Sequence, residues 1–137
     1  MKKIALFLLV SCMGCSHKAS APAIHVSLVN NQRSVKIKGL DYAVISEINR
    51  DSTAGIWENL LPVYRMPADT DMKDYQPLLH GQYQVLDSAV VFTPDTPFAK
   101  GQVYFVRYFR FGDDNSVWDL LKGKKKPGNQ PYTDLTF

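Results

Sequence analysis

The sequence predicts an all-β protein, built as an antiparallel β-sandwich, and three observations lead to this fold class. Short segments that alternate apolar and polar residues recur along the chain, and turn residues such as Gly, Pro, Asn and Asp separate them. The periodicity predicts no amphipathic helix of ten or more residues. The 137 residues, 12% of them aromatic, suffice for one domain with its own apolar core.

The first predicted strands form a hairpin near the N-terminus of the domain. Residues 24–28 alternate in polarity, residues 30–33 (Asn-Asn-Gln-Arg) supply a turn, and residues 35–37 resume the alternation. Residues 42–48 are expected to form another strand.

The middle of the chain is predicted to be less regular. Residues 57–61 fit one helical turn, which Pro62 limits. Residues 63–66 are expected as a short edge strand. Residues 67–81 contain two prolines, a glycine and several aspartates, and they form the longest predicted irregular stretch.

The second half contains the clearest strands. Residues 83–86 and 89–93 are predicted to pair around a turn at Asp87 and Ser88. Residues 102–111 are largely apolar or aromatic on both faces, which predicts a central strand whose aromatics pack in the core rather than form a glycan- or peptide-binding platform. Residues 132–137 are expected to close the sheet.

One segment carries a resemblance to a known fold. Residues 90–104, Val-Val-Phe-Thr-Pro-Asp-Thr-Pro-Phe-Ala-Lys-Gly-Gln-Val-Tyr, resemble part of the bacterial Ig-like domains of cell-surface proteins. The resemblance implies that Phe98 plugs the end of an Ig-like sandwich, that Gly101 permits a turn, and that Tyr104 occupies the corner position of such folds. A transthyretin-like sandwich and a lipocalin-like barrel remain alternatives.

The N-terminus has the three parts of a secretory signal. Lys2 and Lys3 precede seven apolar residues at 4–10, and small residues with two cysteines follow. Seven apolar residues are too few to span a bilayer as a helix, which takes roughly 20. The predicted organisation is therefore a signal peptide at 1–14, with cleavage before Cys12 or Cys15, a flexible tether at 15–23, and a β-sandwich domain at 24–137.

The residues around the two cysteines resemble the lipobox of bacterial lipoproteins. Leu9-Val10-Ser11-Cys12 has the Leu and the small residue that precede the lipidated Cys, whereas Gly14-Cys15 gives a longer signal and leaves no free thiol. The resemblance covers the first fifteen residues and implies a diacylglyceryl thioether, usually with an acylated N-terminus. In such lipoproteins an Asp directly after the lipidated Cys is the usual signal for retention in the inner membrane. Here Met13 or Ser16 would follow the cysteine, so the resemblance also implies the outer membrane. An ordinary signal peptide cleaved near Ser20 or Ala21 is the alternative.

The sequence shows no clear catalytic or metal-binding pattern. The three histidines lack ligand spacing, and no nucleophile elbow or phosphate-binding loop is present. Two charged groups remain as candidate sites. The acidic run Asp69, Asp71 and Asp74 is predicted to be a solvated loop. The less favoured hypotheses are that it binds calcium or that it provides the carboxylates of a hydrolase. The basic run Lys122, Lys124, Lys125 and Lys126 is predicted to be a solvated loop, with contact to anionic lipid as the alternative.

These observations predict a lipid-anchored envelope protein that acts as a binding or accessory module, without catalysis, cofactor or metal. The expected partner is another envelope protein or a surface polymer. Without the two basic residues of the signal, 14 Lys and Arg face 13 Asp and Glu, so the mature chain lacks the basic excess typical of nucleic-acid binding. A carrier of a small apolar ligand is the alternative function.

Overall fold

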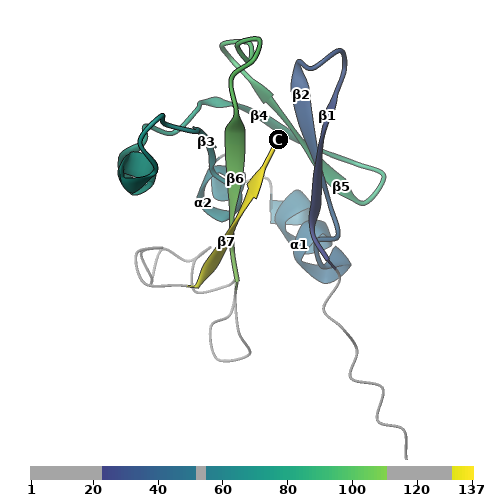
Figure 1. Ribbon diagram of the computed structural model, residues 1–137. Helices are drawn as coiled ribbons and strands as arrows, with labels where there is room; N and C mark the ends of the chain where they lie inside the picture. Colours follow the sequence, from purple (N-terminus) through teal and green to yellow (C-terminus); the bar gives the residue numbers. More distant parts are fainter. Residues whose placement is uncertain (1–22, 52–54, 111–130) are drawn as a thin grey trace, which may run out of the picture.

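The computed structural model describes residues 23–51, 55–110 and 131–137 (Figure 1). Its elements, in chain order, are β1 (His25–Val29), β2 (Ser34–Lys38), α1 (Tyr42–Asp51), α2 (Ile56–Leu60), β3 (Val63–Arg65), the 3-10 helix η1 (Thr70–Tyr75), β4 (Gly81–Leu86), β5 (Ala89–Pro94), β6 (Tyr104–Phe109) and β7 (Tyr132–Thr136).

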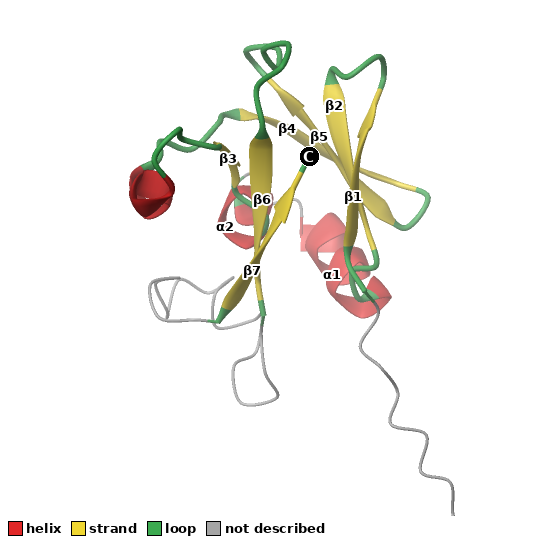
Figure 2. Cartoon of the chain, viewed as in Figure 1, coloured by secondary structure: helices red, strands yellow, loops and turns green. Residues whose placement is uncertain are grey.

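Two antiparallel sheets make up the fold (Figure 2). One has the strand order β1-β2-β5-β4, and the other has the order β3-β6-β7. Lettered A to G in chain order, these strands form the sheets A-B-E-D and C-F-G, which is the arrangement of the constant-type Ig sandwich. The predicted β-sandwich is confirmed, and the barrel alternative is wrong because the described strands form two separate sheets.

Two predicted hairpins are confirmed, and both turn through left-handed backbone. The turn between β1 and β2 has positive φ at Asn30, Asn31 and Gln32, with values of 54°, 55° and 63°. The turn between β4 and β5 has positive φ at Asp87 and Ser88, as a two-residue type I′ hairpin requires. Asn and Asp tolerate this region better than most residues, which explains their place in these turns.

The strand predicted at residues 42–48 is wrong, since this segment lies in α1. Asp41 begins the helix: its Oδ1 accepts from the N–H of Ala43 at 2.8 Å, and its carbonyl accepts from the N–H of Ile45 at 3.0 Å. Ile45 and Ile48 are buried. The prediction that no helix reaches ten residues is therefore also wrong, because α1 has ten. A capped helix with one buried face outweighs the β propensity of its branched residues.

The remaining sequence predictions mostly hold. The helical turn at 57–61 corresponds to α2, and the short edge strand at 63–66 corresponds to β3. Strand β6 lies between β3 and β7, so it is the central strand of its sheet, as its two apolar faces predicted. The irregular stretch at 67–81 contains η1, which the sequence did not predict.

The core lies between the two sheets and is closed at one end by the helices. One sheet contributes Val35, Ile37, Val90 and Phe92, and the other contributes Val63 and Val106. The helices complete the same cluster with Ile48 of α1, Ile56 and Leu60 of α2, and Leu61, which follows α2. Antibody domains bear a cysteine on strand F two residues after the corner tyrosine, and this chain has Val106 there.

Tyr104, the first residue of β6, makes the contact expected of the corner tyrosine. Its hydroxyl accepts a hydrogen bond from the N–H of Ala99, five residues upstream, at 2.8 Å. The ring packs against Phe98, with centroids 4.7 Å apart, and Gly101 turns the chain with a φ of 75°. Phe98 also packs against the core, as the sequence predicted.

Replacing Tyr104 by phenylalanine is expected to lower the free energy of unfolding by about 1 kcal/mol, because the N–H of Ala99 loses its partner while the ring contacts remain. Urea denaturation of the variant and the parent protein measures this difference. Tyr75→Phe is a suitable control, since Tyr75 is 77% exposed. Equal losses in both variants would show that the hydroxyl of Tyr104 has no special role.

Candidate functional site

The outer face of the β3-β6-β7 sheet carries a cluster of aromatic and charged side chains. Strand β6 alternates, so Val106 faces the core while Phe105, Arg107 and Phe109 lie on the opposite face. All three are nevertheless buried. Tyr64 stacks on Phe105 with ring centroids 5.2 Å apart, so a second layer of side chains covers this face.

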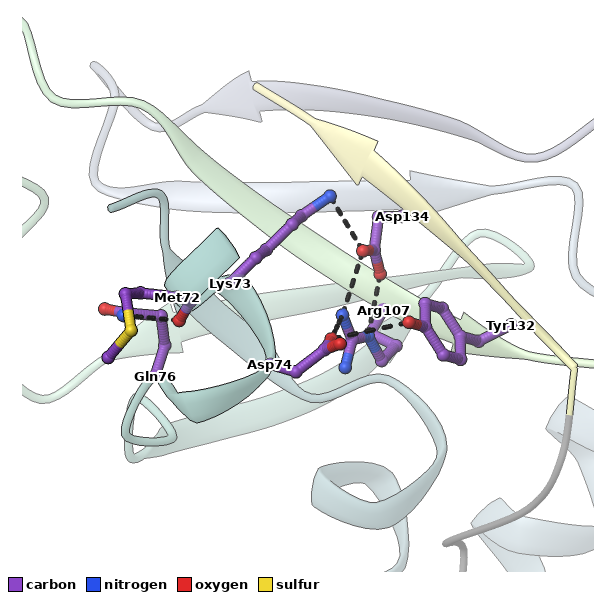
Figure 3. A network of polar contacts seen from close by, with 7 residues as sticks. All are labelled: Met72, Lys73, Asp74, Gln76, Arg107, Tyr132 and Asp134. Atoms are coloured by element: carbon purple, nitrogen blue, oxygen red, sulfur yellow. Dashed lines mark hydrogen bonds and ion pairs between the residues drawn. The ribbon is translucent and has the colours of Figure 1, made fainter. Parts of the chain in front are cut away.

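Arg107 is the centre of this cluster (Figure 3). Its side chain is 10% exposed, and its Nε and Nη2 donate to the two carboxylate oxygens of Asp134 at 2.8 and 3.0 Å. Nη2 also donates to Oδ1 of Asp74 at 2.7 Å. Its guanidinium carbon lies 3.9 Å from the ring centroid of Tyr132. Two carboxylates and an aromatic face therefore bind the guanidinium.

Lys73 adds a second cation to the same carboxylate. Its Nζ lies 2.8 Å from Oδ2 of Asp134 and 4.7 Å from the ring centroid of Phe105. Because Lys73 and Asp74 both belong to η1, these contacts fasten the 3-10 helix to the sheet. None of the residues of η1 is buried, so polar and cation–π contacts hold it in place.

The electrostatics of the cluster favour a structural role over proton transfer. Burial raises the pKa of Asp134, but the hydrogen bonds and positive charges of Arg107 and Lys73 outweigh it and bring the pKa below its ordinary value. The hydrogen bond to Asp134 in turn raises the pKa of Arg107, against the opposing effect of burial. Both groups stay charged at neutral pH, so neither is suited to act as an acid or a base there.

The lowered pKa of Asp134 predicts a loss of stability in acid. The unfolded carboxyl titrates near pH 4, and the folded one titrates lower, so protons bind the unfolded state first as the pH falls. The contribution of this carboxylate is complete above about pH 4 and disappears as the pH falls through the folded value. Urea midpoints between neutral pH and pH 2 measure it, and Asp134→Asn should flatten the acid side of the profile. An unchanged profile in that variant would contradict the assignment.

The acidic run does not converge on one site. Asp69 caps η1, where its Oδ1 accepts from the N–H of Asp71 at 3.0 Å, while Asp71 is exposed and Asp74 binds Arg107. Within the described ranges, no group of three or more His, Cys, Asp or Glu side chains is placed to hold a metal ion. The other predicted site residues, Cys12, Cys15, Lys122, Lys124, Lys125 and Lys126, lie outside the described residues.

Sequence reasoning missed Arg107 as the centre of a network. The available signal was a single cation inside the aromatic run of β6. Its partner becomes evident only from the pairing register, in which Arg107 lies opposite Asp134 on β7. Opposite charges at directly paired positions of an antiparallel sheet attract each other.

Two hollows lie on the described surface. The smaller, about 160 Å³, lies beside the helices and is lined mainly by Leu40, Val44, Trp57, Leu60 and Tyr108. An apolar cavity of about this size holds one benzene-sized molecule, which is below the roughly 300 Å³ typical of ligand sites.

The larger hollow is a crevice of about 310 Å³ at the other end of the sandwich. It lies between the turn at residues 30–33 and the connection at residues 95–103, which contains Phe98. Tyr104 and Phe137 also line it. Its volume reaches the range in which small ligands and peptide side chains bind.

Comparison of the chain with protein-family models, with curated proteins and with solved structures gives no significant match in any of the three. No helix in the described part of the chain is long and apolar enough to cross a membrane.

Proposed function

We propose that this protein is a lipid-anchored module of the bacterial cell envelope, whose Ig-like sandwich binds another protein or a surface polymer without catalysing a reaction. The observation that carries the proposal is the N-terminal sequence, in which a basic start, an apolar run and the Leu-Val-Ser-Cys motif follow in the order of a lipoprotein signal. The outer membrane is the proposed location, because neither cysteine precedes an aspartate.

The arrangement of the domain supports a binding module more than a ligand carrier. Phe92, Ile37 and Leu61 fill the interior between the sheets, and their side chains are buried. Two hollows of the described region lie at opposite ends of the sandwich, and the apolar one has room for only about one benzene-sized group. A carrier of an acyl chain or a similar ligand needs a larger enclosed volume.

The two cysteines provide a direct test of the anchor. In bacteria that process lipoproteins, the full-length chain is expected to fractionate with membranes, and the intact mass should show a diacylglyceryl-modified N-terminal cysteine. Two or more acyl chains give stable anchoring. Cys12→Ser and Cys15→Ser form a matched pair: one should abolish both the lipid mass and the membrane association, and the other should leave them intact. An unmodified chain that begins near Ala21 would refute the anchor.

The binding role has its own test. Cross-linking of the anchored protein in intact cells, followed by mass spectrometry, should recover a specific envelope protein or polymer. The same experiment on a released variant without the lipidated cysteine should recover less of it, because tethering raises the local concentration of the module. Equal recovery of unrelated abundant proteins from both samples would argue against a specific partner.

A further inference from the structure

The crevice at residues 30–33 and 95–103 lies at the end of the sandwich opposite to the one where the chain enters the fold. Strand β1 begins beside α1 and runs away from it to the turn at 30–33, while β5 runs in the same direction to the connection that follows it (Figure 1). In an anchored protein, the tether joins the domain at the first end. The crevice then faces away from the point of attachment and is open to a partner.

The two charged side chains that line the crevice are both basic. Arg33 and Lys100 are exposed and line the crevice, and the described residues of its lining include no Asp or Glu. The salt bridges found within the described ranges include neither residue. The side-chain amides of Asn31 and Gln32 add hydrogen-bond donors on the same side. These groups suit a ligand that carries carboxylates.

The floor of the crevice is aromatic and already packed. Tyr104 and Phe137 stack with centroids 6.0 Å apart, and Phe98 lies 4.7 Å from Tyr104 and 5.3 Å from Phe137. Because these rings pack against one another and Tyr104 is only 6% exposed, they offer little open ring face for a sugar to stack on. Phe98 and Phe137 are only half-buried, however, and this leaves some apolar surface on which a side chain of a peptide can pack.

Hydrogen bonds hold the walls of the crevice in position. The hydroxyl of Ser34 lies 2.8 Å from that of Thr93, and Nδ2 of Asn30 donates to the Ser34 hydroxyl at 3.3 Å, which ties the turn to β5. On the other wall, Tyr104 accepts from the N–H of Ala99, and the N–H of Gln102 donates to the Ala99 carbonyl at 3.1 Å. A preformed crevice costs little conformational entropy on binding.

We propose that this crevice binds an acidic peptide segment of a partner protein, with carboxylates at Arg33 and Lys100 and a neighbouring apolar side chain on the floor formed by Phe98, Tyr104 and Phe137. This names the binding surface of the module and therefore rests on the proposed binding function. It does not depend on which cysteine is lipidated.

The test is an NMR titration of the full-length protein in detergent micelles with the peptide acetyl-Glu-Phe-Glu-amide. The probe for comparison is acetyl-Gln-Phe-Gln-amide, which has the same shape without the charges. The acidic peptide should shift the amide signals of residues 31–33 and 99–102, and the neutral one should bind several-fold more weakly. Binding of the acidic peptide should also weaken as salt is added, because these charges are exposed.

Charge reversal gives the decisive comparison. Arg33→Glu and Lys100→Glu should each weaken binding roughly tenfold, because an attraction between exposed charges is replaced by a repulsion of similar size. Lys38→Glu is the matched control: Lys38 is exposed, it lies at the end of β2 away from the turn, and its replacement changes the net charge equally. Its affinity should stay within twofold of the parent.

Several outcomes would overturn the proposal. Equal binding of the two peptides, an equal loss in Lys38→Glu, or shifts that map elsewhere would each remove the crevice as an acidic-peptide site. Binding of polygalacturonate at these residues, with no binding of the peptide, would favour an anionic polymer instead. A specific partner recovered in cells whose binding is unaffected by Arg33→Glu and Lys100→Glu would leave the binding module intact and refute only this surface.

Discussion

Replacing Arg107 by alanine is expected to lower the free energy of unfolding by about 3 kcal/mol or more, which places it among the most damaging substitutions in the protein. The variant leaves Asp134 with only Lys73 as a partner, although the carboxylate remains largely buried. Two carboxylates, Asp74 and Asp134, then face the single cation Lys73, and a buried charge with too little compensation costs more than the lost contact itself. Urea denaturation with detection by circular dichroism measures the change.

Two further variants separate the charge effect from the loss of packing. Arg65→Ala removes an exposed arginine from β3 in the same sheet, and it should cost less than about 1 kcal/mol. The double variant Arg107→Met with Asp134→Leu removes both buried charges, so it should be more stable than Arg107→Met alone. If Arg107→Ala costs no more than Arg65→Ala, the cluster does not stabilise the fold as described.

Replacing Phe92 by alanine is expected to cost about 3–5 kcal/mol. Phe92 lies on β5 between Val35 of β2 and Tyr83 of β4, and it is fully buried. Its ring centroid lies 4.7 Å from that of Tyr83, whose hydroxyl in turn donates to the carbonyl of Leu61 at 2.9 Å. The truncation therefore opens a cavity where the sheet meets the segment that follows α2.

Thermal and urea denaturation of graded variants test this prediction. Phe92→Leu preserves most of the volume, so it should cost no more than about 1.5 kcal/mol. Tyr75→Ala removes an aromatic ring of similar size from an exposed position, and it should stay within about 0.5 kcal/mol of the parent. A loss below about 1 kcal/mol for Phe92→Ala would show that this site collapses around the missing ring.

The hairpins and the central strand were predictable because their signals are local. Asp87 and Ser88 form a two-residue turn, and residues 102–111 are apolar on both faces, so neither feature needs information from elsewhere in the chain. The corner tyrosine was predictable for a similar reason, because Tyr104 follows Phe98 and Gly101 within a short segment.

The features that were missed depend on longer-range or competing effects. In residues 42–48, the branched side chains favour a strand, and only the capping by Asp41 and the burial of Ile45 and Ile48 decide for a helix. Asp74 and Asp134 lie far apart in the sequence, and the sheet and η1 bring both to Arg107. Local patterns do not contain such pairings.

The identity of Val106 has a consequence for how the protein reaches its folded state. Many small exported domains depend on disulfides, which form only in an oxidising compartment. Here the two cysteines of the chain are both at its start, and the core position on β6 is a valine. The sandwich therefore folds without thiol oxidation, so its folding should proceed equally well in reducing and oxidising surroundings and should need no disulfide isomerase.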